Sequence, residues 1–270
     1  MGSTLGSMLD HPFGSPVPSI PLNPHTLVFV VAQVRFPLVV SINDESFVGP
    51  FQELIRPQYP DLERAVEAQI MLGPEGVHRS EAGTVWKFSA PNNDWHVALT
   101  TGFVALSTTA YTSRIEFLDR LRFVLDALEQ WLRPRRVSRL GFRYVDRLDD
   151  SDLDHLSTFI RPEVLGPAVV EPGEHGVLRH ALTECHYELS GGASLKARWG
   201  KLPAGTSLDP SVAAATGPSW VCDLDASIEN IDFDKKDIMA KASAFGDVIY
   251  RYYRWMVTDE FIRAHGGVLT

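Results

Sequence analysis

The sequence has little cysteine and no long apolar run. Cys185 and Cys222 are the only cysteines among 270 residues, which excludes a disulfide-rich scaffold. Each lies at a predicted strand position, where a buried free thiol is the commoner state, so we expect no disulfide. The longest apolar run, residues 27–32, has the length of a strand. A membrane-spanning helix needs roughly 18 or more such residues, so no membrane span is expected.

The N-terminus also lacks the basic and then apolar stretch of an export signal. It has five prolines instead, at positions 12, 16, 18, 21 and 24. Proline disfavours helix and favours extended chain, so residues 1–24 are predicted to form a flexible, solvated tail. The expected location is the cytoplasm.

Basic residues are fewer than acidic ones, 25 against 34, and the formal net charge is -9. This balance argues against a surface that binds nucleic acid or anionic lipid as a whole, but it permits a local basic patch. The hydrophobic fraction of 44% is ordinary for a globular protein and excludes disorder throughout the chain.

The motifs of several large enzyme classes are absent as well. No phosphate-binding glycine loop, dinucleotide fingerprint, nucleophile elbow or zinc-protease helix occurs. A run of potential metal ligands ends in Cys185 and His186, but strand alternation sends those two side chains to opposite faces. We therefore predict no metal, no cofactor and no catalytic residues, and we favour a non-catalytic protein.

What is present is a regular alternation of strand and helix patterns. The first part predicts the following elements: a strand at 27–36, a helix at 46–69 interrupted by prolines, strands at 84–89, 95–100 and 103–108, and a helix with an apolar stripe at 117–131. The second part predicts a strand at 137–147, a short helix from 149, strands at 182–189, 194–200 and 220–227, and a closing helix at 235–265.

The two parts share one element order, which predicts an α+β fold with internally duplicated β-α-β-β-β-α halves at 25–134 and 135–270. We expect a mostly antiparallel, continuous sheet covered on one face by the two long helices. Two segments break the symmetry, at 165–176 and 202–218. The small and polar residues of the second segment favour a mobile loop, although functional loops of this length also occur.

Side-chain alternation then predicts a basic open face on this sheet. On the strand 137–147, Arg139, Arg143 and Arg147 share one face, and Phe142 lies on the other. The same sorting of the other strands gives the candidate binding residues Arg35, Arg139, Arg143, Lys196 and Arg198.

Two interpretations of this face remain open. Arginine suits planar, two-point recognition of carboxylate or phosphate, so the row fits an anionic partner. Alternatively, cross-strand pairs such as Arg198 with Asp223 or Asp225 neutralise the charge, and the face is merely solvated.

Several segments carry a resemblance. They are Gln33-Val34-Arg35-Phe36, the pair Trp86 and Trp95, residues 103–111, residues 139–145, and Val257-Thr258-Asp259-Glu260. Over residues 25–265 the chain resembles a sporadically distributed family of uncharacterised bacterial proteins of similar length, from which the proline-rich N-terminus departs. The resemblance implies a bacterial cytoplasmic protein with an accessory or defence-linked role, and it carries over no catalytic residue.

Two functions follow as hypotheses. The first is a binding module whose basic face engages a partner, with another protein or a second copy favoured over nucleic acid, and with no membrane contact. The second is an enzyme or sensor for a small anionic metabolite, in which the same arginines hold phosphate or carboxylate. In that case His96, His186 or Glu184 would act as acid or base.

Overall fold

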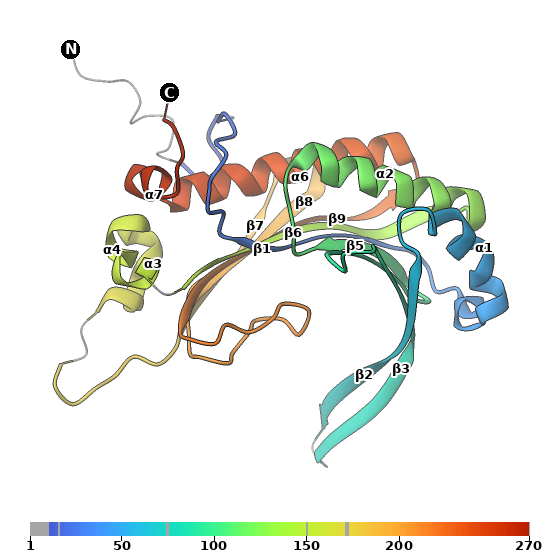
Figure 1. The fold of residues 1–270 in the computed structure, drawn as a ribbon, viewed down its shortest axis with the longest axis horizontal. Helices are drawn as coiled ribbons and strands as arrows, with labels where there is room; N and C mark the ends of the chain where they lie inside the picture. Colours follow the sequence, from blue (N-terminus) through green and yellow to red (C-terminus); the bar gives the residue numbers. More distant parts are fainter. Residues whose placement is uncertain (1–10, 16, 74–75, 150, 171–172, 270) are drawn as a thin grey trace. The chain divides into compact units, whose positions relative to one another are not determined.

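A computed structural model describes residues 11–15, 17–73, 76–149, 151–170 and 173–269 (Figure 1). It has a mixed α+β fold, as predicted. The described strands form one nine-stranded antiparallel sheet in the order β2-β3-β4-β5-β1-β6-β9-β8-β7. The expectation of a single continuous sheet is therefore confirmed.

Most of the predicted strands are present, and their bounds lie within a few residues of those predicted. The strands are β1 (Leu27–Arg35), β2 (Asp61–Gly73), β3 (Gly76–Ser89), β4 (Trp95–Leu99), β5 (Phe103–Thr108), β6 (Arg136–Leu148), β7 (Ala181–Glu188), β8 (Ala193–Leu202) and β9 (Ser219–Asp232). The α-helices are α1 (Glu45–Ile55), α2 (Arg114–Trp131), α3 (Ser151–Asp154), α4 (Leu156–Phe159), α5 (Pro162–Leu165), α6 (Lys235–Met256) and α7 (Asp259–Ala264).

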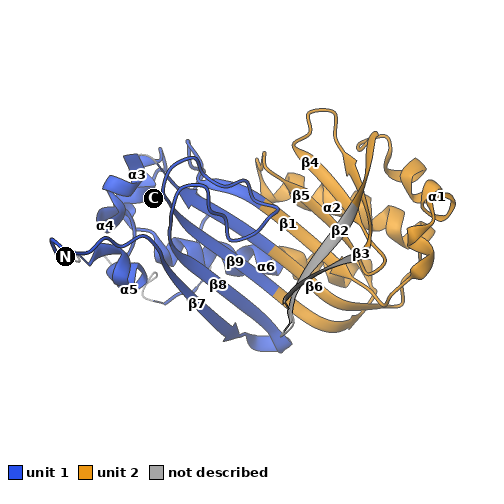
Figure 2. Cartoon of the chain, turned by 90° about the horizontal axis from the view of Figure 1, so that it is seen from below, with its two compact units in different colours: residues 1–29, 143–226, 244–270 blue, residues 30–142, 227–243 orange. Residues whose placement is uncertain are grey.

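The chain divides into two compact units (Figure 2). Unit 1 consists of Met1–Phe29, Arg143–Ala226 and Ala244–Thr270, and unit 2 of Val30–Phe142 and Ser227–Ser243. The strands β1, β6 and β9 and the helix α6 each contribute residues to both units. The compact units therefore differ from the consecutive halves 25–134 and 135–270 that the element order suggests.

The core of unit 2 forms under α2. Ser113 caps this helix by accepting a hydrogen bond from the backbone N–H of Glu116, the expected role of serine at this position. The apolar stripe of α2 is buried, and its Phe117 contacts Trp95 of β4 and Phe142 of β6 at ring distances of 5.6 and 5.2 Å. The predicted stripe on this helix is confirmed.

The core of unit 1 forms under the C-terminal part of α6. Tyr252 lies fully buried, 5.6 Å from the ring of Tyr187 in β7 and 6.4 Å from that of Trp199 in β8. The thiol of Cys222 lies 3.4 Å from the sulfur of Met256. Both cysteines are free, as expected.

Two predicted helices are wrong in extent. The helix expected at 46–69 ends at Ile55, and β2 begins at Asp61, because Pro57 and Pro60 prevent continuation and the following residues pair with β3. The helix expected at 235–265 ends at Met256. There Val257 forms a bridge with Ile160, and the next residue caps α7.

The described part of the proline-rich segment contacts unit 1. The ring of Phe13 lies 5.1 Å from that of Tyr187, and the N–H of Ile20 donates to the hydroxyl of Tyr250 at 2.8 Å. The N–H of Asn23 donates to a backbone carbonyl near the end of α7 at 2.7 Å. These contacts differ from the solvated tail that the composition suggests.

Candidate functional site

The candidate site is a charged cluster on the open side of the strands of unit 1. Alternation along β6 buries Phe142 completely and turns Arg143 to the opposite face, where its side chain keeps 14% exposure. The Nε of Arg143 donates to Oδ1 of Asp223 at 2.6 Å, and its Nη2 donates to Oδ2 at 2.9 Å. Asp223 lies on the neighbouring strand β9 and is 1% exposed.

Arg198 of β8 approaches the same carboxylate from the other side. Its Nε donates to Oδ2 of Asp223 at 3.0 Å, and its Nη2 is also hydrogen bonded to that oxygen. One buried carboxylate therefore bridges two guanidinium groups. We call Arg143, Asp223 and Arg198 the triad; its formal charge is +1.

The fourth charge comes from the loop between β8 and β9, residues 203–218, which we call the strap. Oδ2 of Asp209 in the strap accepts from Nη1 of Arg143 at 2.6 Å. Further along β6, Nη1 of Arg147 donates to the backbone carbonyl of Ala213 at 2.8 Å. Within unit 1, the strap lies on the side of the strands away from α6 (Figure 1).

The environment of Asp209 favours its charged form. Burial alone would raise the pKa of this carboxyl, but hydrogen bonds from Arg143 and from the backbone N–H of Ser211 hold the pKa below its ordinary value. Asp209 is therefore an anion at neutral pH and compensates the charge of the triad.

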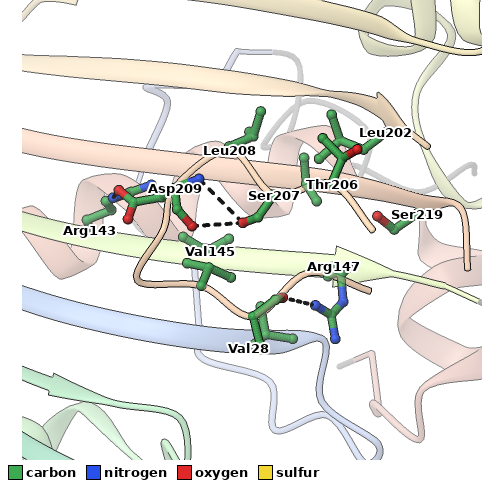
Figure 3. A pocket seen from close by; sticks show the side chains of 13 residues that line it. Val28, Arg143, Val145, Arg147, Leu202, Thr206, Ser207, Leu208, Asp209 and Ser219 are labelled. Carbon is green, nitrogen blue, oxygen red and sulfur yellow. Dashed lines mark hydrogen bonds and ion pairs between the residues drawn. The ribbon is translucent and has the colours of Figure 1, made fainter. Parts of the chain in front are cut away.

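A small cavity of about 10 Å³, the space of one water molecule, lies between the strap and the strands (Figure 3). Val28, Val145 and Val221 line it from the strands, and Leu208 lines it from the strap. Ser219 also lines it, and its buried hydroxyl has no hydrogen-bond partner among the described residues. The strap thus covers this surface without filling it.

The five predicted binding residues belong to two units. Arg143, Lys196 and Arg198 lie in unit 1, where Lys196 pairs with Glu184 of β7 at 2.9 Å. Arg35 and Arg139 lie in unit 2.

The two residues of unit 2 have local surroundings of their own. The Nε of Arg35 donates to the side chain of Gln33 at 2.7 Å. The guanidinium of Arg139 lies over Gly141, where an added Cβ would come within 2.2 Å of its Nη1.

The cross-strand pair considered for Arg198 is present, because Asp223 pairs with it as that interpretation requires. In unit 1 the positive charge of the face is therefore partly neutralised by the sheet itself. Asp225, the other candidate, lies on the same strand.

The candidate acid and base residues are divided between the two units. His96 belongs to unit 2, where its Nδ1 lies 2.9 Å from the hydroxyl of Ser89 and burial lowers the pKa of its ring. His186 is exposed on β7 of unit 1, and Glu184 is engaged by Lys196. Among the described residues, no three potential ligands are grouped to hold a metal ion. No helix in the described part of the chain is long and apolar enough to cross a membrane.

Unit 2 has a second, wider hollow beside the start of α2. Trp95 lines it with Arg120, whose guanidinium lies 4.4 Å from the ring centre, and Asp94, Glu116 and Asp119 add negative charge. None of the predicted binding residues lines it.

Sequence reasoning missed the role of Asp209. Its only local signal is a turn pattern, in which Ser207 and Pro210 flank an aspartate, and that pattern says nothing about a distant arginine. Comparison of the chain with models of protein families and with curated proteins gives no match.

Proposed function

We propose that this chain is a non-catalytic binding protein, and that the open sheet face of unit 1 engages an acidic segment of a partner protein. Arg143 and Arg198 form the centre of the contact, with Lys196 beside them. The observation that carries the proposal is the triad, a pair of arginines held by a single buried carboxylate with a net charge of +1 on the sheet itself.

The two arginines of the triad are preorganised to bind an anion. Asp223 holds both guanidinium groups in fixed positions, so less side-chain entropy is lost when a carboxylate binds. Fixed donors of this kind give orientation as well as attraction, which is why arginine is enriched where one protein recognises another.

The partner class follows from charge and space. A formal charge of -9 on the chain opposes close approach of a nucleic acid, which carries a charge on every nucleotide, more than that of a protein segment with one or a few carboxylates. The cavity of about 10 Å³ at the site is far smaller than the 300–1,000 Å³ typical of small-molecule sites. Both facts favour a protein segment over the alternative, an enzyme or sensor for a small anionic metabolite.

We also propose that the chain is internally duplicated. Outward from the central pair β1 and β6, the strand orders are β1-β5-β4-β3 and β6-β9-β8-β7, which match one to one. The strand β2 has no counterpart.

The alternation of side chains along the strands supports a sheet that has its helices on one face and the triad on the other. Phe142 contacts α2 and Cys222 contacts α6, and each precedes a triad member by one residue. Arg35 and Arg139 remain sequence-based predictions for a similar contact in unit 2.

The proposal is tested by fluorescence anisotropy with a labelled oligo-glutamate peptide. Arg198→Ala should weaken binding about tenfold, and Arg198→Glu should abolish it. The matched control is Arg122→Ala, which removes an exposed arginine of α2 that pairs with Asp119 of the same helix. Binding that is equal in the wild type, in both Arg198 variants and in the control would overturn the proposal.

The metabolite alternative is addressed by thermal unfolding with nucleotides and phosphorylated sugars. A ligand that binds only the folded state raises the melting temperature. A rise that Arg198→Ala removes would favour the small-anion function instead.

A further inference from the structure

We infer that the strap is an intramolecular competitor: Asp209 occupies the position on Arg143 that a carboxylate of the partner takes, and partner binding releases the strap. This inference rests on the proposed function and adds its regulation and the chemistry of the recognised segment.

The charges of the triad are unbalanced on the sheet. The sheet itself presents two guanidinium groups against one carboxylate, and with the strap in place the side chain of Arg143 is only 14% exposed. A charge that is largely withdrawn from water needs a counter-charge, because solvent no longer stabilises it fully. Asp209 supplies that counter-charge from a loop, so a carboxylate of another chain is its chemical equivalent.

The strap does not contact all of the surface that it covers. Ser219 lines the cavity beneath it, and the hydroxyl of Ser219 forms no hydrogen bond with the strap or with any other described residue. Direct contacts to this hydroxyl and to the cavity walls would add hydrogen bonding and van der Waals contact that the strap does not supply. A segment that filled the cavity and reached Ser219 would bind this surface better than the strap does.

The strap is attached to the strands by few contacts. It has no helix or strand of its own between Leu202 and Ser219. The N–H of Gly205 donates to the carbonyl of Ala215 at 2.9 Å, which closes the base of the strap. Its tip is hydrogen bonded to the strands through Asp209, which accepts from Arg143, and through the carbonyl of Ala213, which accepts from Arg147. Loss of these two contacts frees the tip while the base stays closed.

The strap also indicates what the partner segment contains. Leu208, directly before Asp209, lines the cavity together with Val28, Val145 and Val221. The recognised segment should therefore combine one acidic residue with an adjacent branched apolar residue. The acidic group pairs with Arg143, and the apolar one fills the cavity.

The experiment uses the strap itself as probe. A fluorescently labelled peptide with the sequence of residues 203–218 is titrated against four full-length proteins: the wild type, Asp209→Ala, the control Thr216→Ala, and a variant in which Gly-Asn-Gly replaces residues 206–214. Thr216 is exposed in the strap and does not line the cavity. Thermal unfolding of each variant checks that it is folded.

We expect Asp209→Ala and the shortened protein to bind the peptide about tenfold more tightly than the wild type and Thr216→Ala, because the competitor is removed. A peptide with alanine in place of its aspartate should bind these two variants no more tightly than it binds the wild type. Both results together support the inference.

Other outcomes overturn it in distinguishable ways. If all four proteins bind oligo-glutamate equally and binding still depends on Arg198, the strap is no competitor and the proposed function survives. If the shortened protein binds neither the peptide nor oligo-glutamate, both the inference and the proposed function are overturned. If single-stranded DNA binds the shortened protein more tightly than either peptide, the partner is a nucleic acid and the acidic-segment inference is wrong.

Discussion

Arg143 and Asp223 form a two-point ion pair across the neighbouring strands β6 and β9, with Nε 2.6 Å from Oδ1 and Nη2 2.9 Å from Oδ2. The carboxylate is almost fully buried, and a second arginine shares it. The pair therefore does more than neutralise the face, because it holds two guanidinium groups in place next to the strap.

Asp223→Asn should be strongly destabilising. The substitution leaves two largely buried guanidinium groups with one counter-charge fewer, which typically costs about 3–5 kcal/mol in the free energy of unfolding. Urea denaturation measures this. The control is Asp119→Asn, which breaks an ion pair in which both partners are more than half exposed and should cost less than about 1 kcal/mol. Equal losses in the two variants would show that the triad has no structural role.

A buried carboxyl makes stability depend on pH. Asp146 accepts a hydrogen bond from the hydroxyl of Thr26 at 2.8 Å, and burial raises its pKa to about 7. In the unfolded chain this pKa is near 4, so between about pH 4 and pH 7 the folded state holds a proton that the unfolded state has lost. The contribution of Asp146 to the free energy of unfolding is therefore complete below pH 4, and it declines as the pH rises to 7.

Asp146→Asn should remove this decline, because the amide is neutral and its oxygen still accepts from Thr26. As the pH rises from 4 to 8, the unfolding free energy of the variant should increase relative to that of the wild type by up to about 4 kcal/mol. Urea denaturation across this range measures the difference. The control is Asp149→Asn, at a side chain that is 42% exposed. Its curve of unfolding free energy against pH should run parallel to that of the wild type. A parallel curve for Asp146→Asn would mean that Asp146 is ionised in the folded protein.

Gly200 should not tolerate a side chain. It has a φ of +150°, and an added Cβ would lie 1.9 Å from the carbonyl oxygen of Ala181 on the paired strand β7. Gly200→Ala should cost about 2–4 kcal/mol in unfolding free energy, since the backbone pairing must shift. Gly102→Ala, where an added Cβ meets nothing within 4 Å, should change it by less than about 1 kcal/mol. The prediction fails if the two variants are equally stable.

The N-terminal segment should loosen when its aromatic contact is removed. Phe13 lies against Tyr187 and Tyr252 at ring distances of 5.1 and 5.7 Å. Phe13→Ala should speed hydrogen exchange at the N–H of Ile20 about tenfold, because aromatic contacts of this kind contribute about 1 kcal/mol beyond burial. His11→Ala, at an exposed position, is the control. Unchanged exchange in Phe13→Ala would mean that the polar contacts alone hold the segment.

Elements whose signal is local follow from the amino-acid pattern alone. The stripe from Phe117 to Leu128 places α2, and the alternation on β6 places Arg143 opposite Phe142, because a periodicity of 3.6 or 2 residues is set by the backbone alone. The β5 strand was likewise predicted at its observed bounds, Phe103–Thr108.

Which elements and which charges meet depends on the folded structure as a whole. The folded structure made a strand of Asp61–Gly73 by pairing it with β3, and it joined Arg143 to Asp223 and to Asp209, which are 80 and 66 residues away in the chain. It also buried Asp146 next to Thr26, 120 residues away. These outcomes depend on strand order and on the path of a loop, which local propensity does not encode because the free energy of such contacts comes from residues far apart in sequence.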